Sequence, residues 1–150
     1  MKLIGHVGFT GTQKGMTAGQ AGVVRSHLWK FATEGGLFFH HGDCVGADEQ
    51  AHALSKEFRY APIIHPPKNP AKRAFCFAPM DDMREPKDYL ARNKDIVRES
   101  HAMIAAPAEY DEQLRSGTWS TIRYAEKLGR PVVIVFPDGS QRRIAAKVLA

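Results

Sequence analysis

The sequence has only two cysteines, no extended Lys/Arg tract and no long apolar run. Cys44 and Cys76 lack metal-motif spacing and are too few for a disulfide framework, which favours a reducing, cytoplasmic setting. No apolar stretch approaches the roughly 18 residues that a membrane span needs. The apolar segment near Met1 is short and lacks a small-residue cleavage site, so we expect neither a signal peptide nor membrane contact.

Composition and charge are those of an ordinary globular protein. The 150 residues are 43% hydrophobic and 25% charged, which is typical of folded soluble chains, and the length predicts a single domain over residues 1–150. The net charge of +5 favours anionic partners such as nucleotides. Because the basic residues are scattered and not interleaved with aromatic residues, we expect nucleic acid to be an unlikely partner.

Apolar runs that suit buried strands alternate along the chain with segments of helical periodicity. Residues 132–136 form a continuous apolar run, rich in β-branched residues, of the kind found in strands buried on both faces. The alternation predicts an α/β fold with a mainly parallel, five-stranded sheet and helices on both faces. The expected buried strands are residues 3–9, 37–39, 63–64, 103–105 and 132–136, and the expected helices are residues 17–34, 47–58, 88–99 and 118–128.

Two segments depart from this alternation. Residues 66–86 contain five prolines and no clear period, which predicts a long loop, and loops of this length are usually functional or disordered. Within it, Phe75, Phe77 and Met80 would supply an apolar surface for a lid or for the interface of a homo-oligomer. Residues 140–149 are expected to form a terminal helix that begins with a serine cap.

Polar motifs rich in glycine follow the predicted strands, where open parallel sheets bind their ligands. Thr10, Gly11 and Thr12 lie between the first strand and a helix. Glycine permits close approach of the backbone there, and free amides at a helix start attract anions. An ordinary tight turn between strand and helix explains the same residues equally well.

The second motif, residues 40–48, follows the second strand and opens a helix. Gly42 and Gly46 suit a tight turn whose amides face a phosphate, and Asp48 either caps the helix or binds a ribose hydroxyl or a base edge. Two adjacent histidines with an aspartate and a cysteine also invite a metal interpretation. Because neighbouring side chains in an extended segment point in opposite directions, we expect no metal and no other cofactor.

The third motif, Ser116-Gly117-Thr118, begins a helix after the fourth strand. Its hydroxyls and free amides make a phosphate cradle, although N-capping by Ser116 or Thr118 accounts for the same residues. Arg92 and Asn93 lie on an amphipathic helix, where Arg92 reaches an anion or pairs with a nearby aspartate. We expect the three loops to meet at one pocket, since helix-start charges then add at one point.

Taken in order, these elements resemble the SLOG superfamily, a Rossmann-like group that includes DprA, YspA-type proteins and the Lonely Guy (LOG) phosphoribohydrolases. The similarity rests on the loop after the first strand, on residues 41–48 (HGDCVGAD), on the Arg-Asn pair and on residues 117–132, and it spans most of residues 3–136. The resemblance implies a nucleotide or nucleotide-derived ligand at the strand ends. It implies ligand contacts from Gly42, Gly46, Asp48, Arg92, Asn93, Gly117 and Thr118.

The chain departs from the LOG enzymes at one position. Their P-G-G-x-G-T-x-x-E motif supplies a glutamate that helps to cleave an N-glycosidic bond, and Thr121 stands at that position here. A hydrolase of this type would need Asp48, Glu49 or Asp43 as its acid or base, and Arg92 is a further candidate catalytic residue.

Three functions therefore stay open. The first is a module that binds a nucleoside phosphate or a signal derived from NAD, such as ADP-ribose, in order to sense or sequester it. The second is a nucleotide N-glycosidic hydrolase. The third is DprA-like binding of single-stranded nucleic acid, with Trp119 or Phe75 as a stacking surface. The absent glutamate favours the first. The candidate ligand-binding residues are Thr10, Gly11, Thr12, Gly42, Asp43, Gly46, Asp48, Arg92, Asn93, Ser116, Gly117, Thr118 and Trp119.

Overall fold

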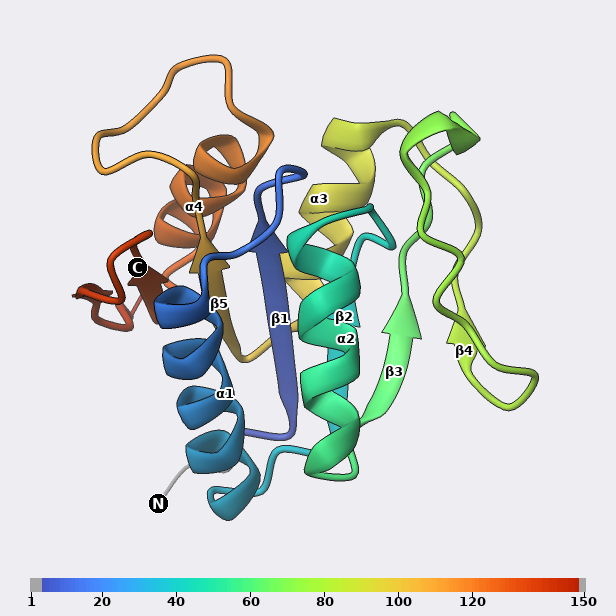
Figure 1. Cartoon of the computed structure of the whole chain (residues 1–150), viewed down its shortest axis with the longest axis horizontal. Helices are drawn as coiled ribbons and strands as arrows, with labels where there is room; N and C mark the ends of the chain where they lie inside the picture. Colours follow the sequence, from blue (N-terminus) through green and yellow to red (C-terminus); the bar gives the residue numbers. More distant parts are fainter. Residues whose placement is uncertain (1–3, 149–150) are drawn as a thin grey trace.

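The computed structural model describes residues 4–148, which form one seven-stranded sheet with helices on both faces (Figure 1). The strand order is β4-β3-β2-β1-β5-β6-β7, and only β6 and β7 pair antiparallel. The strands are β1 (His6–Gly11), β2 (Phe38–His41), β3 (Ala61–Ile64), β4 (Asp82–Met83), β5 (Ala102–Ala106), β6 (Val132–Val135) and β7 (Gln141–Ile144). The helices are α1 (Ala18–Thr33), α2 (Ala47–Glu57), α3 (Tyr89–Glu99) and α4 (Gly117–Lys127), with one 3-10 turn, η1 (Pro70–Lys72).

The predicted α/β, Rossmann-like class is confirmed, and the two sheet faces carry separate cores. Helices α1 and α2 cover one face, where Phe9 and Phe39 are fully buried, and α3 and α4 cover the other, where Ile134 is fully buried (Figure 1). Side chains alternate between faces along a strand. Covering both faces therefore requires the near-continuous apolar runs seen in the sequence.

The start of α1 is tied to the carboxyl edge of the sheet. The Thr17 hydroxyl accepts a hydrogen bond from the Gln20 backbone, and the Gln20 side chain accepts one from the Thr17 backbone, which is a capping box. The buried Gln20 amide also donates to the carbonyls of Pro107 and Val135, both at 2.8 Å. The loops after β1, β5 and β6 are thus held together.

Chain order reverses between β1 and β5 in the middle of the sheet. From β1 the chain proceeds through β2 to β3 on one side, and it later returns to β5 and continues to β6 on the other. The connections that leave the carboxyl ends of β1 and β5 therefore diverge. In sheets of this class the crevice at such a point is the usual ligand site.

The sheet has seven strands where five are expected, because both edges carry an additional strand. Within the segment predicted as a loop, η1 forms a turn and β4 pairs with β3. The predicted C-terminal helix over residues 140–149 is wrong. Asp138 and Gly139, with φ +85° at the glycine, form a tight turn that returns β7 against β6, as Asp-Gly pairs commonly do between antiparallel strands.

Described residues 4, 5, 37 and 136 were expected in strands and lie just outside them. Leu37 precedes β2 and is 61% exposed, so it is not part of the core. Leu3 and Leu149, which belong to the predicted first strand and terminal helix, lie outside the described residues. Among residues 4–148, no helix has both the length and the apolar character that crossing a membrane requires.

Candidate functional site

A cavity of about 650 Å³ opens at the carboxyl edge of the sheet, where the loops after β1, β2 and β5 meet α3. The three sequence motifs thus contribute to one cavity, as expected from their positions after strands. Its lining includes these residues singled out from the sequence: Thr10, Gly11, Thr12, Gly42, Asp48, Arg92, Asn93, Ser116, Gly117 and Thr118.

The first turn of α4 presents free groups to this cavity. Ser116 is the N-cap, and its hydroxyl accepts the backbone N–H of Trp119 at 3.2 Å. Thr118 is 9% exposed and lines the cavity, and its hydroxyl has no hydrogen-bond partner among residues 4–148. A Cβ placed on Gly117 would meet nothing within 4 Å. The amides and the positive end of the helix dipole are therefore accessible to an anion.

Arg92 anchors α3 to the end of β2 from the floor of the cavity. Its side chain is 4% exposed and donates to the carbonyls of Gly42 and His65 and to the side chains of Asn93 and Cys44. Among residues 4–148, no carboxylate lies within 4.0 Å of its guanidinium. The nearby aspartate at position 95 pairs with Lys87 and Arg98 instead. The positive charge is therefore held in place without a neutralising ion pair, which suits an anionic ligand.

Asp48 faces the same cavity from the first turn of α2. One carboxylate oxygen accepts the backbone N–H groups of Gly42 and Cys44, each at 3.2 Å. Burial raises the pKa of Asp48 to about 6, although Arg92 and the two amides lower it. Its other oxygen has no hydrogen-bond partner in the described part of the chain, and it is placed to accept a hydroxyl from a ligand.

Gly46 supports the site without lining it. It has φ +88°, and a Cβ there would clash with the carbonyl of Gln13. This close approach lets the amide of Ala47 donate to the Thr12 carbonyl at 2.9 Å, while the Thr12 amide donates to Ala106 at 3.0 Å. Gly46 thus lets the loops after β1 and β2 pack together. A glycine is needed at this position because of its positive φ and the close backbone contact.

Three further candidates lie outside the cavity lining. Asp43 is fully buried, accepts the Arg73 Nε at 2.8 Å and the Cys76 amide at 2.8 Å, and so anchors the segment after β3. Trp119 is 2% exposed, and its indole N–H donates to Glu109 at 3.0 Å. Glu49 is exposed on the outer side of α2. Their side chains therefore hold the fold or face solvent, and none reaches the cavity.

Five charged or aromatic residues of the lining are not among the candidates selected from the sequence: Phe9, Lys14, Lys72, Tyr89 and Glu109. A local signal existed only for Tyr89, which lies one helical turn before Arg92 and shares its side of α3. Phe9 belongs to β1, Lys72 ends the short turn η1, and Lys14 and Glu109 lie in loops. No periodic pattern in the sequence predicts which way the loops and the turn face. Thr121, at the position of the LOG glutamate, donates its hydroxyl to the Gly117 carbonyl at 2.8 Å and does not line the cavity.

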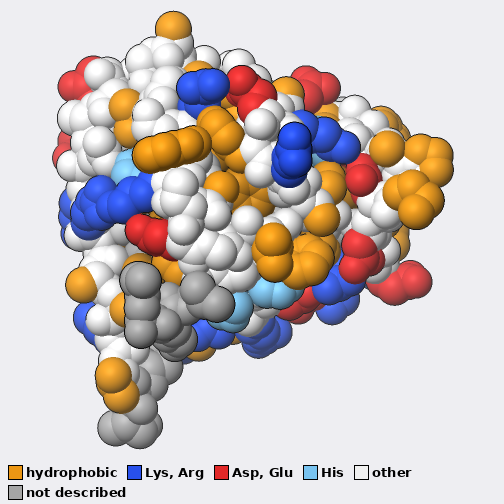
Figure 2. All heavy atoms as spheres, turned by 90° about the horizontal axis from the view of Figure 1, so that it is seen from below, with side chains coloured by type: hydrophobic (Ala, Val, Ile, Leu, Met, Phe, Trp, Pro, Cys, Tyr) orange, Lys and Arg blue, Asp and Glu red, His pale blue; other side chains and the backbone are white. Residues whose placement is uncertain are grey.

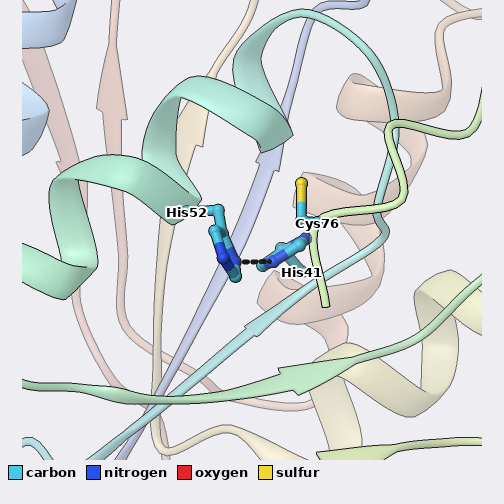
Figure 3. Close-up of side chains that lie close together, drawn as sticks. All are labelled: His41, His52 and Cys76. Carbon is cyan, nitrogen blue, oxygen red and sulfur yellow. Dashed lines mark hydrogen bonds between the residues drawn. The ribbon is translucent and has the colours of Figure 1, made fainter. Parts of the chain in front are cut away.

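A cluster of possible metal ligands lies away from the cavity, where His41, His52 and Cys76 meet (Figure 3). The Nδ1 of His41 accepts the backbone N–H of Asp43 at 3.0 Å. The proton of the neutral ring is therefore on Nε2, which donates to Nδ1 of His52 at 2.8 Å. Metal at Nε2 would leave this ring with no proton on either nitrogen, and the thiol points away from the rings in Figure 3. The cluster fits a hydrogen-bonded pair better than a metal centre.

No protein-family model matches the sequence, and comparison with curated proteins finds no relative. Several solved structures share the fold. The molybdenum cofactor binding protein of Rippkaea orientalis is 23% identical with a TM-score of 0.67, and the match covers 91% of this chain and 78% of that one. The molybdenum cofactor carrier protein of Chlamydomonas reinhardtii is 19% identical with a TM-score of 0.60, covering 86% of this chain and 74% of that one.

A third similar structure is DNA processing protein A of Helicobacter pylori, described for its binding of single-stranded DNA. It is 19% identical with a TM-score of 0.60, and the match covers 86% of this chain and 64% of that one. At these identities the similarities show the Rossmann-like fold and no shared activity. They give no support to the expectation that nucleic acid is an unlikely partner.

Proposed function

We propose that the cavity binds a phosphorylated nucleotide or nucleotide-derived small molecule, such as a nucleoside phosphate or ADP-ribose, and that the protein senses or sequesters it. The observation that carries this proposal is the start of α4, where the Thr118 hydroxyl has no partner among the described residues and Gly117 leaves the helix amides accessible. A phosphate placed there would accept from the hydroxyl and the amides. Membership of the SLOG superfamily is part of the same proposal.

The other walls suit the remainder of such a ligand. Lys14, Lys72 and Arg92 add positive charge around the phosphate position, and Asp48 offers an acceptor for a sugar hydroxyl. Tyr89 supplies an aromatic face within the same lining. The molybdenum cofactor is a second candidate ligand, because two proteins of similar structure are described as binding it.

A hydrolase is the alternative activity, and one observation favours it. Two carboxylates, Asp48 and Glu109, line the cavity although the glutamate of the LOG motif is replaced. The raised pKa of Asp48, about 6, is suited to a group that exchanges protons near neutral pH. Because Glu109 is held by Trp119, we favour binding without turnover.

The test is a binding screen coupled to a product assay. Purified protein is titrated calorimetrically with AMP, ADP, ADP-ribose, NAD, molybdenum cofactor, inorganic phosphate and a single-stranded oligonucleotide. Each ligand that binds is then incubated with the protein, and free base is followed by chromatography. Saturable binding of a nucleotide without release of base is the expected result. Release of base that Asp48→Asn abolishes would establish the hydrolase, and binding of the oligonucleotide alone would overturn the small-molecule proposal.

We also propose that the protein is a homo-oligomer that uses the segment after β3. Phe75 is 55%, Phe77 43% and Met80 96% exposed, and exposed apolar patches commonly mark interaction sites. Light scattering over a range of concentrations tests this proposal. A monomer at every concentration would leave the alternative that the segment is a lid.

A further inference from the structure

Three imidazoles form a hydrogen-bonded row on the sheet face that α3 and α4 cover. Nδ1 of His6 lies 2.8 Å from Nε2 of His40, and Nδ1 of His40 lies 2.9 Å from Nε2 of His65. His40 is fully buried and His65 is 2% exposed. Both nitrogens of the central ring, His40, are hydrogen-bonded to neighbouring imidazoles. The groups at the two ends of the row therefore decide which nitrogen of each ring carries a proton.

A carboxylate closes one end of the row. Oε2 of Glu99, at the end of α3, lies 4.0 Å from Nδ1 of His65, while Oε1 accepts two hydrogen bonds from Arg84. His40, His65 and Glu99 each offer one ligand atom, and these three atoms all lie within 4.8 Å of one another. None of the three residues lines the ligand cavity.

Glu99 and Arg84 are the parts of this cluster that solvent reaches. The Glu99 side chain is 33% exposed and the Arg84 side chain 39%. Figure 2, which looks at the molecule from below, shows histidine side chains near acidic and basic groups on this face. Because His40 and His65 are buried, an ion would have to enter past the partly exposed Glu99, and a functional metal site requires such an entry path.

Proton assignment distinguishes this row from the His41 cluster. If a metal ion takes Nδ1 of His40 and Nε2 of His65, their other nitrogens carry the protons. The Nε2–H of His40 then donates to Nδ1 of His6. Ligating histidines are normally supported by acceptors of this kind. Glu99, which now lies 4.0 Å from Nδ1 of His65, has to turn toward the metal and cannot also accept the Nδ1–H of that ring. In His41 the nitrogen that would have to carry the proton, Nδ1, already accepts the backbone N–H of Asp43. That ring therefore has no proton-bearing nitrogen left if a metal binds its Nε2.

We propose that His40, His65 and Glu99 bind a divalent transition-metal ion, with His6 as the outer partner that orients His40. Two imidazoles and a carboxylate are a donor set that zinc uses widely. Tetrahedral ligation at Zn–N distances of about 2.0–2.1 Å requires nitrogens roughly 3.3 Å apart, so the two rings need to separate slightly and to turn until both nitrogens point at the ion. The carboxylate of Glu99 has to move further than the rings to reach the ion, and its partial exposure leaves room for that movement. The ion takes the place of the hydrogen bond between the two rings. The proton of that bond moves to Nε2 of His40, and His6 then carries its own proton on Nε2, so that all three rings stay neutral.

The test is a titration of chelator-treated protein with zinc, in competition with a chelating dye, and with cobalt, whose visible absorption reports tetrahedral ligation. One equivalent should bind and raise the melting temperature. Glu99→Gln and His65→Gln should each weaken zinc binding at least tenfold. Asp82→Asn is the matched control for Glu99→Gln, because Asp82 also pairs with Arg84 but lies outside the proposed ligand set. It should leave zinc affinity unchanged, as should Cys76→Ser.

Two results would overturn the proposal. Absence of zinc and cobalt binding to a folded protein would mean that the row is a hydrogen-bonded structural element. Zinc binding that survives Glu99→Gln and is lost in Cys76→Ser would place the metal in the His41 cluster. Glu99→Gln changes a partly exposed side chain, so the test does not depend on whether substitutions of the buried histidines fold.

Discussion

The guanidinium of Arg92 donates a hydrogen bond to the carbonyl of Gly42, which lies fifty residues earlier in the chain. The same nitrogen donates to the carbonyl of His65 at 3.0 Å. One side chain of α3 therefore ties together the ends of β2 and β3, and a Cβ on Gly42 would clash with it. The shape of the cavity floor depends on this contact, and the following predictions concern the groups around it.

Gly117→Ala should abolish ligand binding without harming the fold. The added methyl group meets no other segment of the protein within 4 Å, and we expect it to crowd a phosphate bound at the start of α4. Gly22→Ala is the control, since a Cβ there also meets nothing and the position lies on α1, outside the cavity lining. Calorimetric titration and thermal melting of both variants measure the effect. Equal affinity in the two variants would contradict a phosphate site at this helix start.

Thr118→Val should weaken ligand binding roughly tenfold or more and leave stability nearly unchanged. A hydrogen bond to a charged group is worth about 1.5–3 kcal/mol, and the hydroxyl makes no bond within the described protein that the substitution would remove. Titration of the variant with the ligand identified in the screen gives the change. An affinity within twofold of the wild type would show that the hydroxyl does not contact the ligand.

Ligand affinity should fall as the pH is lowered through 6, because burial raises the pKa of Asp48 to about 6. Only the ionised carboxylate accepts a sugar hydroxyl through either oxygen. If that form alone binds, affinity at pH 5.5 should be about fourfold lower than at pH 7.5. A ligand whose phosphates do not titrate in this range, such as NAD, isolates the effect. Asp48→Asn should bind more weakly and lose the pH dependence, and a dependence that persists would assign it to another group.

Stability should decrease on acidification below pH 6.5. Burial lowers the pKa of His65 to about 4 and that of His40 to about 2, whereas both titrate near 6.5 in the unfolded chain. The unfolded state therefore takes up protons first, and each histidine costs up to about 1.4 kcal/mol per pH unit. Urea unfolding at several pH values, with chelator present, should show a slope smaller by about one proton between pH 6 and 4.5 in His65→Gln. An unchanged slope would mean that this ring does not titrate on unfolding.

Gly46→Ala should destabilise the protein by several kcal/mol. The residue has φ +88°, and the new methyl group would clash with the Gln13 carbonyl, so both backbone strain and overpacking contribute. Chemical denaturation measures the loss. Weaker ligand binding with full stability would instead place this glycine directly against the ligand.

The helices are predicted from the sequence more completely than the edge strands. The expected helices match α1, α2, α3 and α4 to within a residue or so at each end, because periodicity and caps such as Thr17 and Ser116 are local signals. The edge strands β4 and β7 were missed. They are short or polar, and edge strands need neither a buried face nor a continuous apolar run. Ser140 was interpreted as a helix cap although its amide and hydroxyl both bond Asp138 in the turn.

The sequence by itself determined the order of the four helices and of β1, β2, β3, β5 and β6, the parallel sheet and the edge at which polar loops gather, because apolar periodicity and chain direction are encoded locally. Tertiary structure decided which side chains meet there. Asp43 and Gly46 belong to the motif, yet they hold the fold, whereas Lys72 and Glu109 reach the cavity from irregular segments. The pairing of His40 with His65 likewise depends on the register between β2 and β3. Such contacts arise only when segments distant in the chain pack together, and no local pattern specifies that packing.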